Sequence, residues 1–284
     1  MVLYGYKVSF DKLDIKQSEN KLLKESKTLL VDNSYILELV NNQNRRVSIT
    51  SNKPFLDNQT NQIINFLVED IVTFSVEKNQ NIIYYKIEKE GTESLVRYWL
   101  SHTFLPIIFT LENIYYFLHA GAVEIDSKPI LFVADSFGGK STLTDFFIKK
   151  NHTMISDDKV AAYMKNEIIY AVPSYPYHRP YRKVEDLGIY IENFAKENKP
   201  ISKIYNLIKS NKDDKITINE IRGIKKFIAL RYATDIELEV NNKSRFDMLS
   251  NIANKIKVYD ITIPWDLDRL EEVYQTIIEH NKKG

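Results

Sequence analysis

The chain contains no cysteine, and only eight of its 284 residues are glycine. Without cysteine there can be no disulfide bond, thiol catalysis or cysteine-ligated zinc, which suits a reducing compartment such as the cytoplasm. An uninterrupted apolar run of about 20 residues, which a membrane span requires, is also missing. The closest stretch, residues 104–122, is interrupted by Pro106, Glu112, Asn113 and His119, so we predict a buried helix there. No apolar run is long enough to indicate a membrane partner. The net charge of only +1 does not indicate a nucleic-acid partner.

The first 93 residues are predicted to form a strand-rich domain. Short apolar runs bounded by polar turns favour strands at Thr28–Asp32, Tyr35–Val40 and Ile82–Ile87. Between them, Asn61–Asp70 is amphipathic and is a candidate helix. The boundary is expected near Glu90–Thr92.

Residues 94–284 are predicted to form a second, mixed α/β domain. One or two buried helices are expected over Glu93–Leu118, and strands over 122–125, 129–133 and 153–156. Residues 160–164 and 168–172 read as a hairpin, and the chain after Pro173 is expected to be largely helical. The last helix has a plausible N-cap at Asp266 and an apolar face, formed by Leu267, Leu270, Val273, Tyr274, Ile277 and Ile278.

The most informative stretch runs from Ala134 to Thr142, between the apolar run 130–133 and an expected helix that ends near Lys150. A strand, a glycine turn and a helix in this order can wrap a phosphate with backbone N–H groups and the positive end of the helix. In a P-loop the lysine reaches the β- and γ-phosphates and the following hydroxyl binds Mg²⁺. The candidate nucleotide-binding residues are Ser136, Phe137, Gly138, Gly139, Lys140, Ser141 and Thr142. An ordinary strand-to-helix turn with a solvated lysine is the alternative.

Two adjacent carboxylates, Asp157 and Asp158, end the short strand that follows. Phosphoryl transfer uses one acid to complete the Mg²⁺ shell and one to accept the proton of the attacking hydroxyl. A polar turn that merely ends a strand is the other interpretation. His119, expected at the end of the buried helix, is either structural or catalytic.

Three segments in close order resemble the catalytic core of HPr kinase/phosphorylase. They are Leu118–Val123, Ala134–Ser141 and Ile155–Val160. The resemblance is closer still to the small HPr-kinase-like enzymes of peptide-modification clusters, such as lasso-peptide precursor kinases. It implies a P-loop core of the HPr kinase/PEP carboxykinase type that phosphorylates a serine hydroxyl with Mg-ATP.

Carried over by position, the resemblance implies that Gly139, Lys140 and Ser141 hold the phosphates and the metal. Asp157 would be the general base, Asp158 would position Mg²⁺, and His119 would lie beside the γ-phosphate or the base; the two aspartate roles could be exchanged. Three features depart from the family. Ala134 replaces the first glycine, Phe137 stands where a small residue is usual, and Glu220–Gly223 lies too far along the chain to supply the family's metal-binding Glu.

These observations predict an ATP-dependent kinase that acts on a Ser or Thr hydroxyl of a peptide or small protein. The alternatives are a nucleotide-binding regulator or pseudo-kinase, favoured by Ala134 and Phe137, and a small-molecule kinase. Tyr177 and Arg179 lie in a tyrosine- and arginine-rich stretch, 175–182, which is either an acceptor-binding wall or a structural turn. The reverse reaction and hexamer of the classical enzyme are not carried over, and a homo-oligomer remains an open expectation.

Overall fold

The computed structural model describes residues 2–10, 20–25, 35–39, 45–55, 61–78, 80–135, 137–180 and 183–283. The predicted strand Thr28–Asp32, Ser136 and residues 181–182 lie outside this part of the chain. Contacts divide the described residues into two compact units. The first unit contains the residues up to Ile114 together with 183–187, and the second contains 115–180 and 188–283.

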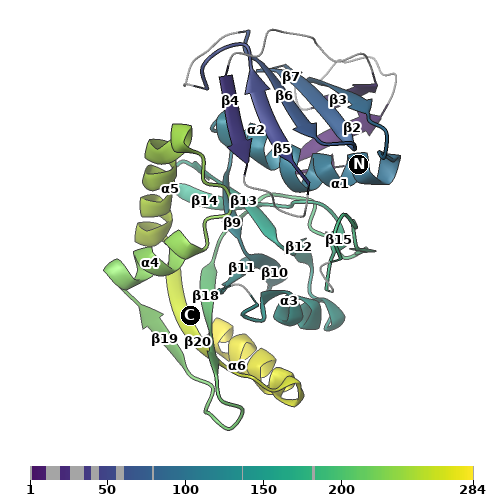
Figure 1. Ribbon diagram of the computed structural model, residues 1–284. Helices are drawn as coiled ribbons and strands as arrows, with labels where there is room; N and C mark the ends of the chain where they lie inside the picture. Colours follow the sequence, from purple (N-terminus) through teal and green to yellow (C-terminus); the bar gives the residue numbers. More distant parts are fainter. Residues whose placement is uncertain are drawn as a thin grey trace. The chain divides into compact units, whose positions relative to one another are not determined.

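The first unit is built on one eight-stranded sheet, in the order β1-β2-β3-β8-β7-β6-β5-β4 (Figure 1). Strand β3 runs parallel to β2 and to β8, and the other neighbours are antiparallel. Its strands are β1 (Val2–Leu3), β2 (Tyr6–Phe10), β3 (Asn20–Glu25), β4 (Tyr35–Leu39), β5 (Val47–Ser51), β6 (Ile63–Val68), β7 (Val72–Glu77) and β8 (Ile82–Ile87). The strand predictions at 35–40 and 82–87 are confirmed.

The helix proposed for Asn61–Asp70 is wrong, because residues 63–68 form strand β6. This strand pairs with β5 on one side and with β7 on the other. A short apolar run has no periodicity that separates a buried strand from a helix. Pairing on both sides therefore decides the conformation here.

The helices after β8 complete the core of the first unit. Helix α1 (Glu93–Trp99) starts at Thr92, whose hydroxyl accepts the Leu95 N–H, and is followed by the π-helical turn η1 (Leu100–Phe104) and α2 (Leu105–Leu111). Phe104 stacks on Phe74 of the sheet with ring centroids 4.7 Å apart. The division by contacts at Ile114 consequently lies later in the chain than the expected boundary near residue 93.

The second unit contains a six-stranded sheet, ordered β12-β10-β11-β18-β20-β19, and a four-stranded sheet, ordered β17-β14-β13-β9. Strands β11, β18 and β20 are parallel neighbours, whereas β10 and β19 are antiparallel to theirs. Their bounds are β9 (Tyr116–His119), β10 (Gly121–Ile125), β11 (Lys128–Val133), β12 (Met154–Ser156), β13 (Lys159–Lys165), β14 (Ile168–Val172), β17 (Lys199–Pro200), β18 (Lys203–Ser210), β19 (Ile218–Ile221) and β20 (Lys257–Pro264). A small ribbon joins β15 (Tyr177–His178) and β16 (Ile189–Tyr190).

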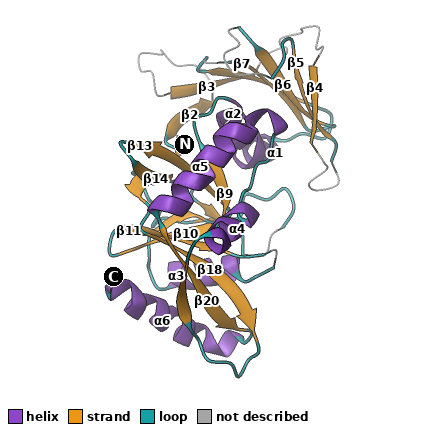
Figure 2. Ribbon diagram, turned by 90° about the vertical axis from the view of Figure 1, so that its left-hand side faces the viewer, coloured by secondary structure: helices purple, strands orange, loops and turns teal. Residues whose placement is uncertain are grey.

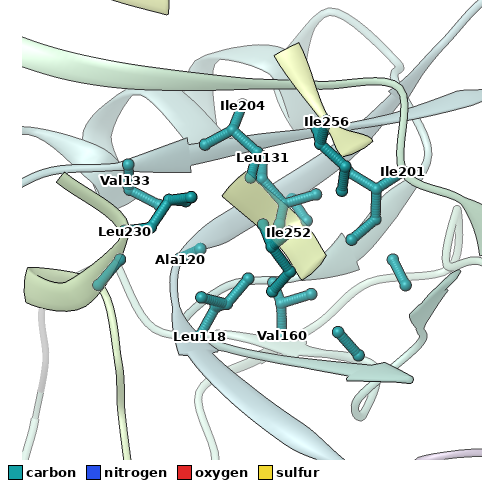
Figure 3. Close-up of a cluster of buried hydrophobic side chains, with 14 of the residues drawn as sticks. Leu118, Ala120, Leu131, Val133, Val160, Ile201, Ile204, Leu230, Ile252 and Ile256 are labelled. Carbon is teal, nitrogen blue, oxygen red and sulfur yellow. The ribbon is translucent and has the colours of Figure 1, made fainter. Parts of the chain in front are cut away.

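Apolar side chains on both faces of the six-stranded sheet form two cores. Leu131 and Val133 of β11 belong to a core shared with the four-stranded sheet and with helices α4 (Ile224–Tyr232) and α5 (Asn242–Lys255) (Figure 3). Phe132 of the same strand belongs to the other core, which is closed by α3 (Lys140–Lys149) and α6 (Leu270–Lys282). Figure 2 shows α4 beside α5 and α3 beside α6. The 3-10 turns are η2 (Glu239–Asn241) and η3 (Leu267–Arg269).

Two helix predictions are wrong in part. The expected helix over 93–118 ends at Leu111, and residues 116–119 form β9, so His119 ends a strand rather than a helix. The part after Pro173 is not largely helical, since it contributes β18, β19 and β20. Strand β18 has a parallel neighbour on each side, and Asn206 and Lys209 interrupt its apolar residues without the strict alternation that identifies a half-buried strand.

The predicted last helix is present. Asp266 accepts the Asp268 N–H at 3.0 Å, and Val273 and Ile277 are buried. None of the helices in the described part of the chain has both the length and the apolar character that crossing a membrane requires.

Candidate functional site

The strand, turn and helix predicted around Lys140 are all present. Strand β11 ends at Val133 and α3 begins at Lys140; we call residues 134–139 between them the Lys140 loop. Gly139 has φ +88°, a conformation that glycine adopts without a Cβ penalty, and Phe137 has φ +61°. A Cβ on Gly138 would come within 2.7 Å of the Ala134 methyl and 2.9 Å of the Asp135 carbonyl oxygen. Glycine at 138 thus makes room for the alanine at the position where the P-loop pattern has its first glycine.

The Lys140 side chain is buried at the start of α3. Its Nζ donates to the Ala134 carbonyl at 2.8 Å and to the Asp135 carbonyl at 3.4 Å. Ser141 and Thr142 follow in the first turn of the helix, and the Phe137 ring is 82% exposed. The solvated lysine of the alternative interpretation is wrong, because only 3% of Lys140 is exposed.

His119, Asp158 and Asp235 form a cluster beside this loop. His119 Nδ1 lies 3.3 Å from Asp158 Oδ1 and 3.8 Å from Asp235 Oδ1. Backbone pairing sets the geometry, because Lys159 is the register partner of His119 and the Ala120 N–H donates to the Asp158 carbonyl. The Lys159 ammonium in turn forms an ion pair with Asp235 at 2.5 Å.

Charge links this cluster to Lys140. Burial lowers the pKa of His119; the negative charge of Asp158 opposes that shift and the positive charge of Lys140 adds to it. A neutral imidazole is therefore favoured, with one ring nitrogen turned towards the two carboxylates.

Asp157 has a different environment from its neighbour Asp158. Its carboxylate is buried, with Oδ2 accepting the Arg179 N–H at 2.7 Å and Oδ1 lying 3.0 Å from His178 Nδ1. The other ring nitrogen of His178 is 3.2 Å from Asp145 Oδ1 on α3. His178 thus bridges one carboxylate at the end of β12 and one on the helix that follows the Lys140 loop.

Two carboxylates around one buried imidazole favour the imidazolium. Burial alone would lower the pKa of His178, but its contact with Asp157 and the charges of Asp157 and Asp145 raise this pKa above its ordinary value. Of the two adjacent carboxylates, Asp158 has the more accessible side chain, 18% exposed against 4% for Asp157.

The two residues expected to bind an acceptor occupy different places. The Arg179 guanidinium lies 3.5 Å from Asp158 Oδ2, so it belongs to the cluster. The Tyr177 ring packs edge to face on Tyr190, with centroids 5.6 Å apart, within the β15–β16 ribbon. The contacts of Tyr177 thus suit the structural alternative.

A cavity of about 280 Å³ borders the Lys140 loop at Ala134 and Asp135. Two polar side chains form the floor of the cavity, near the end of β11. They are Asn206 and Asp260, and Asn206 Nδ2 donates to Asp260 Oδ1 at 2.7 Å. These two residues are register partners on β18 and β20, at positions where neighbouring layers are apolar. The lining residues are Val133, Ala134, Asp135, Asn206, Leu207, Ile208, Ile221, Lys225, Ile228, Ala229, Tyr232, Ala233 and Asp260.

The donor set near Lys140 suits Mg²⁺ rather than a transition metal. Ser141 and Asp158 offer hard oxygen ligands, and no group of three or more His, Asp or Glu side chains in the described part of the chain is placed to hold a metal by itself. Mg²⁺ is usually bound through one or two protein oxygens together with substrate phosphates and water. The residues present therefore fit a metal that arrives with a phosphorylated substrate.

Sequence reasoning did not identify three residues of the site. His178 lies in the stretch that follows the resembling core, so it could have been singled out with the neighbouring Tyr177 and Arg179. Asp145 on α3 and Asp235 after α4 carry no local pattern. Only the fold brings these two acids to His178 and to His119.

Comparison with known proteins finds partial likenesses among solved structures only. No protein-family model matches the chain, and no curated protein is similar to it. Among solved structures, the HPr(Ser) kinase/phosphatase from Coxiella burnetii matches with 15% sequence identity and a TM-score of 0.35, over 59% of this chain and 97% of that chain. A likeness at this level carries no functional argument, so the function has to be argued from the geometry of the site itself.

Proposed function

We propose that the chain is a kinase that transfers the γ-phosphate of Mg-ATP to a Ser or Thr hydroxyl of a peptide or small protein. The observation that carries the proposal is the convergence of a buried lysine at the start of α3 with the Asp158–His119 pair. In phosphoryl transfer the protein mainly positions the reactants and neutralises the charge that develops on the transferred group. Lys140 and the N–H groups of the Lys140 loop supply that charge next to an accessible carboxylate.

The two aspartates divide the work differently from the first expectation. A general base needs a lone pair that can reach the acceptor hydroxyl. Asp157 is buried, with Oδ2 accepting the Arg179 N–H and Oδ1 within ion-pair distance of His178, whereas Asp158 has the more exposed side chain. We therefore assign proton acceptance to Asp158, the role that the resemblance implied for Asp157, and the positioning of the β12 end to Asp157.

Ser141 is the residue of this chain that would hold Mg²⁺ together with the phosphates. The ion, when bound, neutralises charge on the β- and γ-phosphates. Lys140 leaves the Ala134 and Asp135 carbonyls to meet the same phosphates, a move that its flexible four-carbon stem permits.

The test is a transfer assay with labelled ATP and a library of Ser- and Thr-containing peptides, comparing the wild type with Lys140→Ala, Asp158→Asn and Ser141→Ala. We expect Asp158→Asn to lower kcat by about 10² to 10⁴, the usual contribution of a general base, with the Mg²⁺ requirement unchanged. Ser141→Ala should instead raise the Mg²⁺ concentration needed for half-maximal rate.

Three outcomes would count against these assignments. If Asp158→Asn raises the Mg²⁺ requirement instead, Asp158 is a metal ligand and the base lies elsewhere. Phosphorylation that is equal in the wild type and Lys140→Ala would remove the kinase assignment. Nucleotide binding without transfer to any acceptor would favour the regulator or pseudo-kinase.

A small hydroxy compound is the second candidate acceptor, because the cavity beside the Lys140 loop has a polar floor at Asn206 and Asp260. Ligand pockets commonly have apolar walls and a few polar groups that fix orientation. If such a compound is the acceptor, Asp260→Asn should raise its KM and leave the KM for ATP unchanged. A peptide acceptor with unchanged KM in this variant would exclude the cavity as its site.

A further inference from the structure

An exposed tryptophan lies next to Gly139 of the Lys140 loop. Trp265 follows β20 directly, and its backbone N–H donates to the Ser210 carbonyl at the end of β18. Atom Cζ3 of its indole lies 3.6 Å from the position that a Cβ on Gly139 would occupy, which is ordinary van der Waals contact. Even so, 47% of the residue is exposed. The ring thus lies beside the loop and is partly open to a ligand.

Lys209 adds a cation to the same place. Its Nζ lies 4.0 Å from the centroid of the Trp265 ring, within the range of a cation–π interaction, for which tryptophan is the best aromatic partner. This contact holds the indole in one orientation and brings positive charge next to the loop. We call Trp265 and Lys209 the indole shelf.

The strand order places the indole shelf and the acids at the same edge of the sheet, but over different strands. Strands β11, β18 and β20 are parallel neighbours, so the Lys140 loop, Lys209 and Trp265 lie in this order at one edge. Strand β12 is antiparallel to β10, which is antiparallel to β11, so the end of β12 with Asp158 lies at that edge as well, on the far side of the loop. Four strand steps separate β12 from β20, about 19 Å at the usual spacing.

We propose that the indole shelf is the stacking surface for the nucleobase of the bound nucleotide. This inference rests on the proposed function, since it takes the phosphates to lie at the Lys140 loop and the terminal phosphate to point towards Asp158. The base of a nucleotide laid along this edge then reaches Trp265.

Stacking determines which nucleotides the shelf accepts. Every base has a π-face, so an indole binds bases with little regard to their hydrogen-bonding edges. Purines overlap the ring over a larger area than pyrimidines do. The shelf therefore predicts similar affinities for ATP and GTP and weaker binding of CTP and UTP.

The experiment compares a nucleotide with a ligand that lacks a base. Calorimetric titration with Mg-ATP, Mg-GTP, Mg-CTP and magnesium tripolyphosphate is carried out on the wild type, Trp265→Ala, Trp265→Phe and Phe246→Ala. Phe246 is a matched control, an exposed aromatic residue on α5. We expect Trp265→Ala to raise the Kd of Mg-ATP about tenfold or more and to leave the Kd of tripolyphosphate unchanged. Trp265→Phe should raise the Kd of Mg-ATP much less, and Phe246→Ala should leave it unchanged.

Fluorescence gives an independent reading, because the chain has only two tryptophans. Mg-ATP should change the emission of the wild type but not that of Trp265→Phe, in which the buried Trp99 is the sole tryptophan.

Two results would overturn the shelf while the kinase assignment stands. In one, Trp265→Ala leaves the Kd of Mg-ATP unchanged while Lys140→Ala abolishes binding. In the other, Trp265→Ala weakens Mg-ATP and tripolyphosphate equally, which would mean that the indole supports the loop rather than the base. If the wild type binds neither ligand, the proposed function fails and the shelf fails with it.

Discussion

Asp157 and Asp158 are neighbours in the chain, yet their carboxylates have opposite surroundings. Asp157 faces the buried His178 and a backbone N–H, and Asp158 faces His119 and the Arg179 guanidinium. The end of a strand allows this divergence, because consecutive side chains there point to opposite sides. The pair is therefore one fixed carboxylate and one accessible carboxylate, rather than two interchangeable acids.

Replacing His178 should change how stability depends on pH. Its pKa is raised in the folded chain by Asp157 and Asp145 despite burial, so its stabilising contribution is complete below about pH 6.5 and disappears as the pH rises through the folded pKa. We expect His178→Gln to lower the free energy of unfolding by about 2 kcal/mol at pH 6 and by less at pH 9. Urea unfolding across this range measures the difference.

His280 provides a control of opposite sign. Burial lowers its pKa, and the nearby Lys203, Lys283 and Lys257 add to the shift. A lowered histidine pKa stabilises the fold above the unfolded pKa, and this stabilisation is lost as the pH falls. His280→Gln should therefore affect stability more at pH 9 than at pH 6. Equal losses at both pH values in His178→Gln would show that folding does not raise the pKa of His178.

The residues of the site divide into those that sequence reasoning could find and those that it could not. Lys140, His119 and Asp158 lie in short segments whose order predicts their meeting. Asp145, Asp235 and Trp265 become neighbours of the site only through helix and strand packing. The burial of a site residue was harder to predict than its membership of the site, since nothing in the sequence Asp157–Asp158 indicates which acid is buried.

At the level of elements, two of the predictions that failed share one cause. Segments 63–68 and 116–119 are short apolar runs that pair with neighbouring strands on one or both sides. Such a run carries no period that separates a strand from a buried helix. The hairpin 159–172 and the last helix were predictable because a polar turn and an amphipathic face mark them.

The packing of α3 on the sheet gives a testable element contact. Gly121 of β10 lies against the buried Thr144 of α3, and a Cβ on residue 121 would come within 2.1 Å of Thr144 Oγ1. Gly121→Ala must push the helix away from the strand, which we expect to cost about 1 to 3 kcal/mol of stability. Because α3 carries Lys140, Ser141 and Asp145, the same change should also weaken nucleotide binding.

A double-mutant cycle isolates this contact. In Gly121→Ala/Thr144→Ala the offending hydroxyl is gone and the nearest Thr144 atom is Cβ, at 3.3 Å from the new methyl. The double variant should regain part of the stability lost by Gly121→Ala, with a coupling of about 0.5 to 3 kcal/mol. Additive losses in chemical denaturation would contradict the close approach of α3 to β10.

On the scale of the whole molecule, each compact unit has its own core and one of the two tryptophans. Trp99 lies in the first unit, where its indole N–H donates to Glu185 at 3.0 Å, and Trp265 lies in the second. Glu185 comes from the short segment 183–187, which the chain contributes to the first unit between two stretches of the second. The first unit is therefore not a simple N-terminal domain.

A ligand at the Lys140 loop should stabilise the second unit alone. A ligand that binds only the folded form adds RT ln(1 + [L]/Kd) to the free energy of unfolding, about 2.7 kcal/mol at 100 times Kd. This raises the midpoint of thermal unfolding by about 5 °C or more for a unit of this size.

In Trp265→Phe, the fluorescence of Trp99 follows the first unit, while far-UV circular dichroism also follows the helices of the second. At saturating Mg-ATP we expect a circular dichroism transition to shift and the Trp99 midpoint to stay. Lys140→Ala, added to the same background, should abolish the shift. If both signals move together, the two cores unfold as one cooperative structure, because a ligand bound in one unit stabilises the other only when their unfolding is coupled.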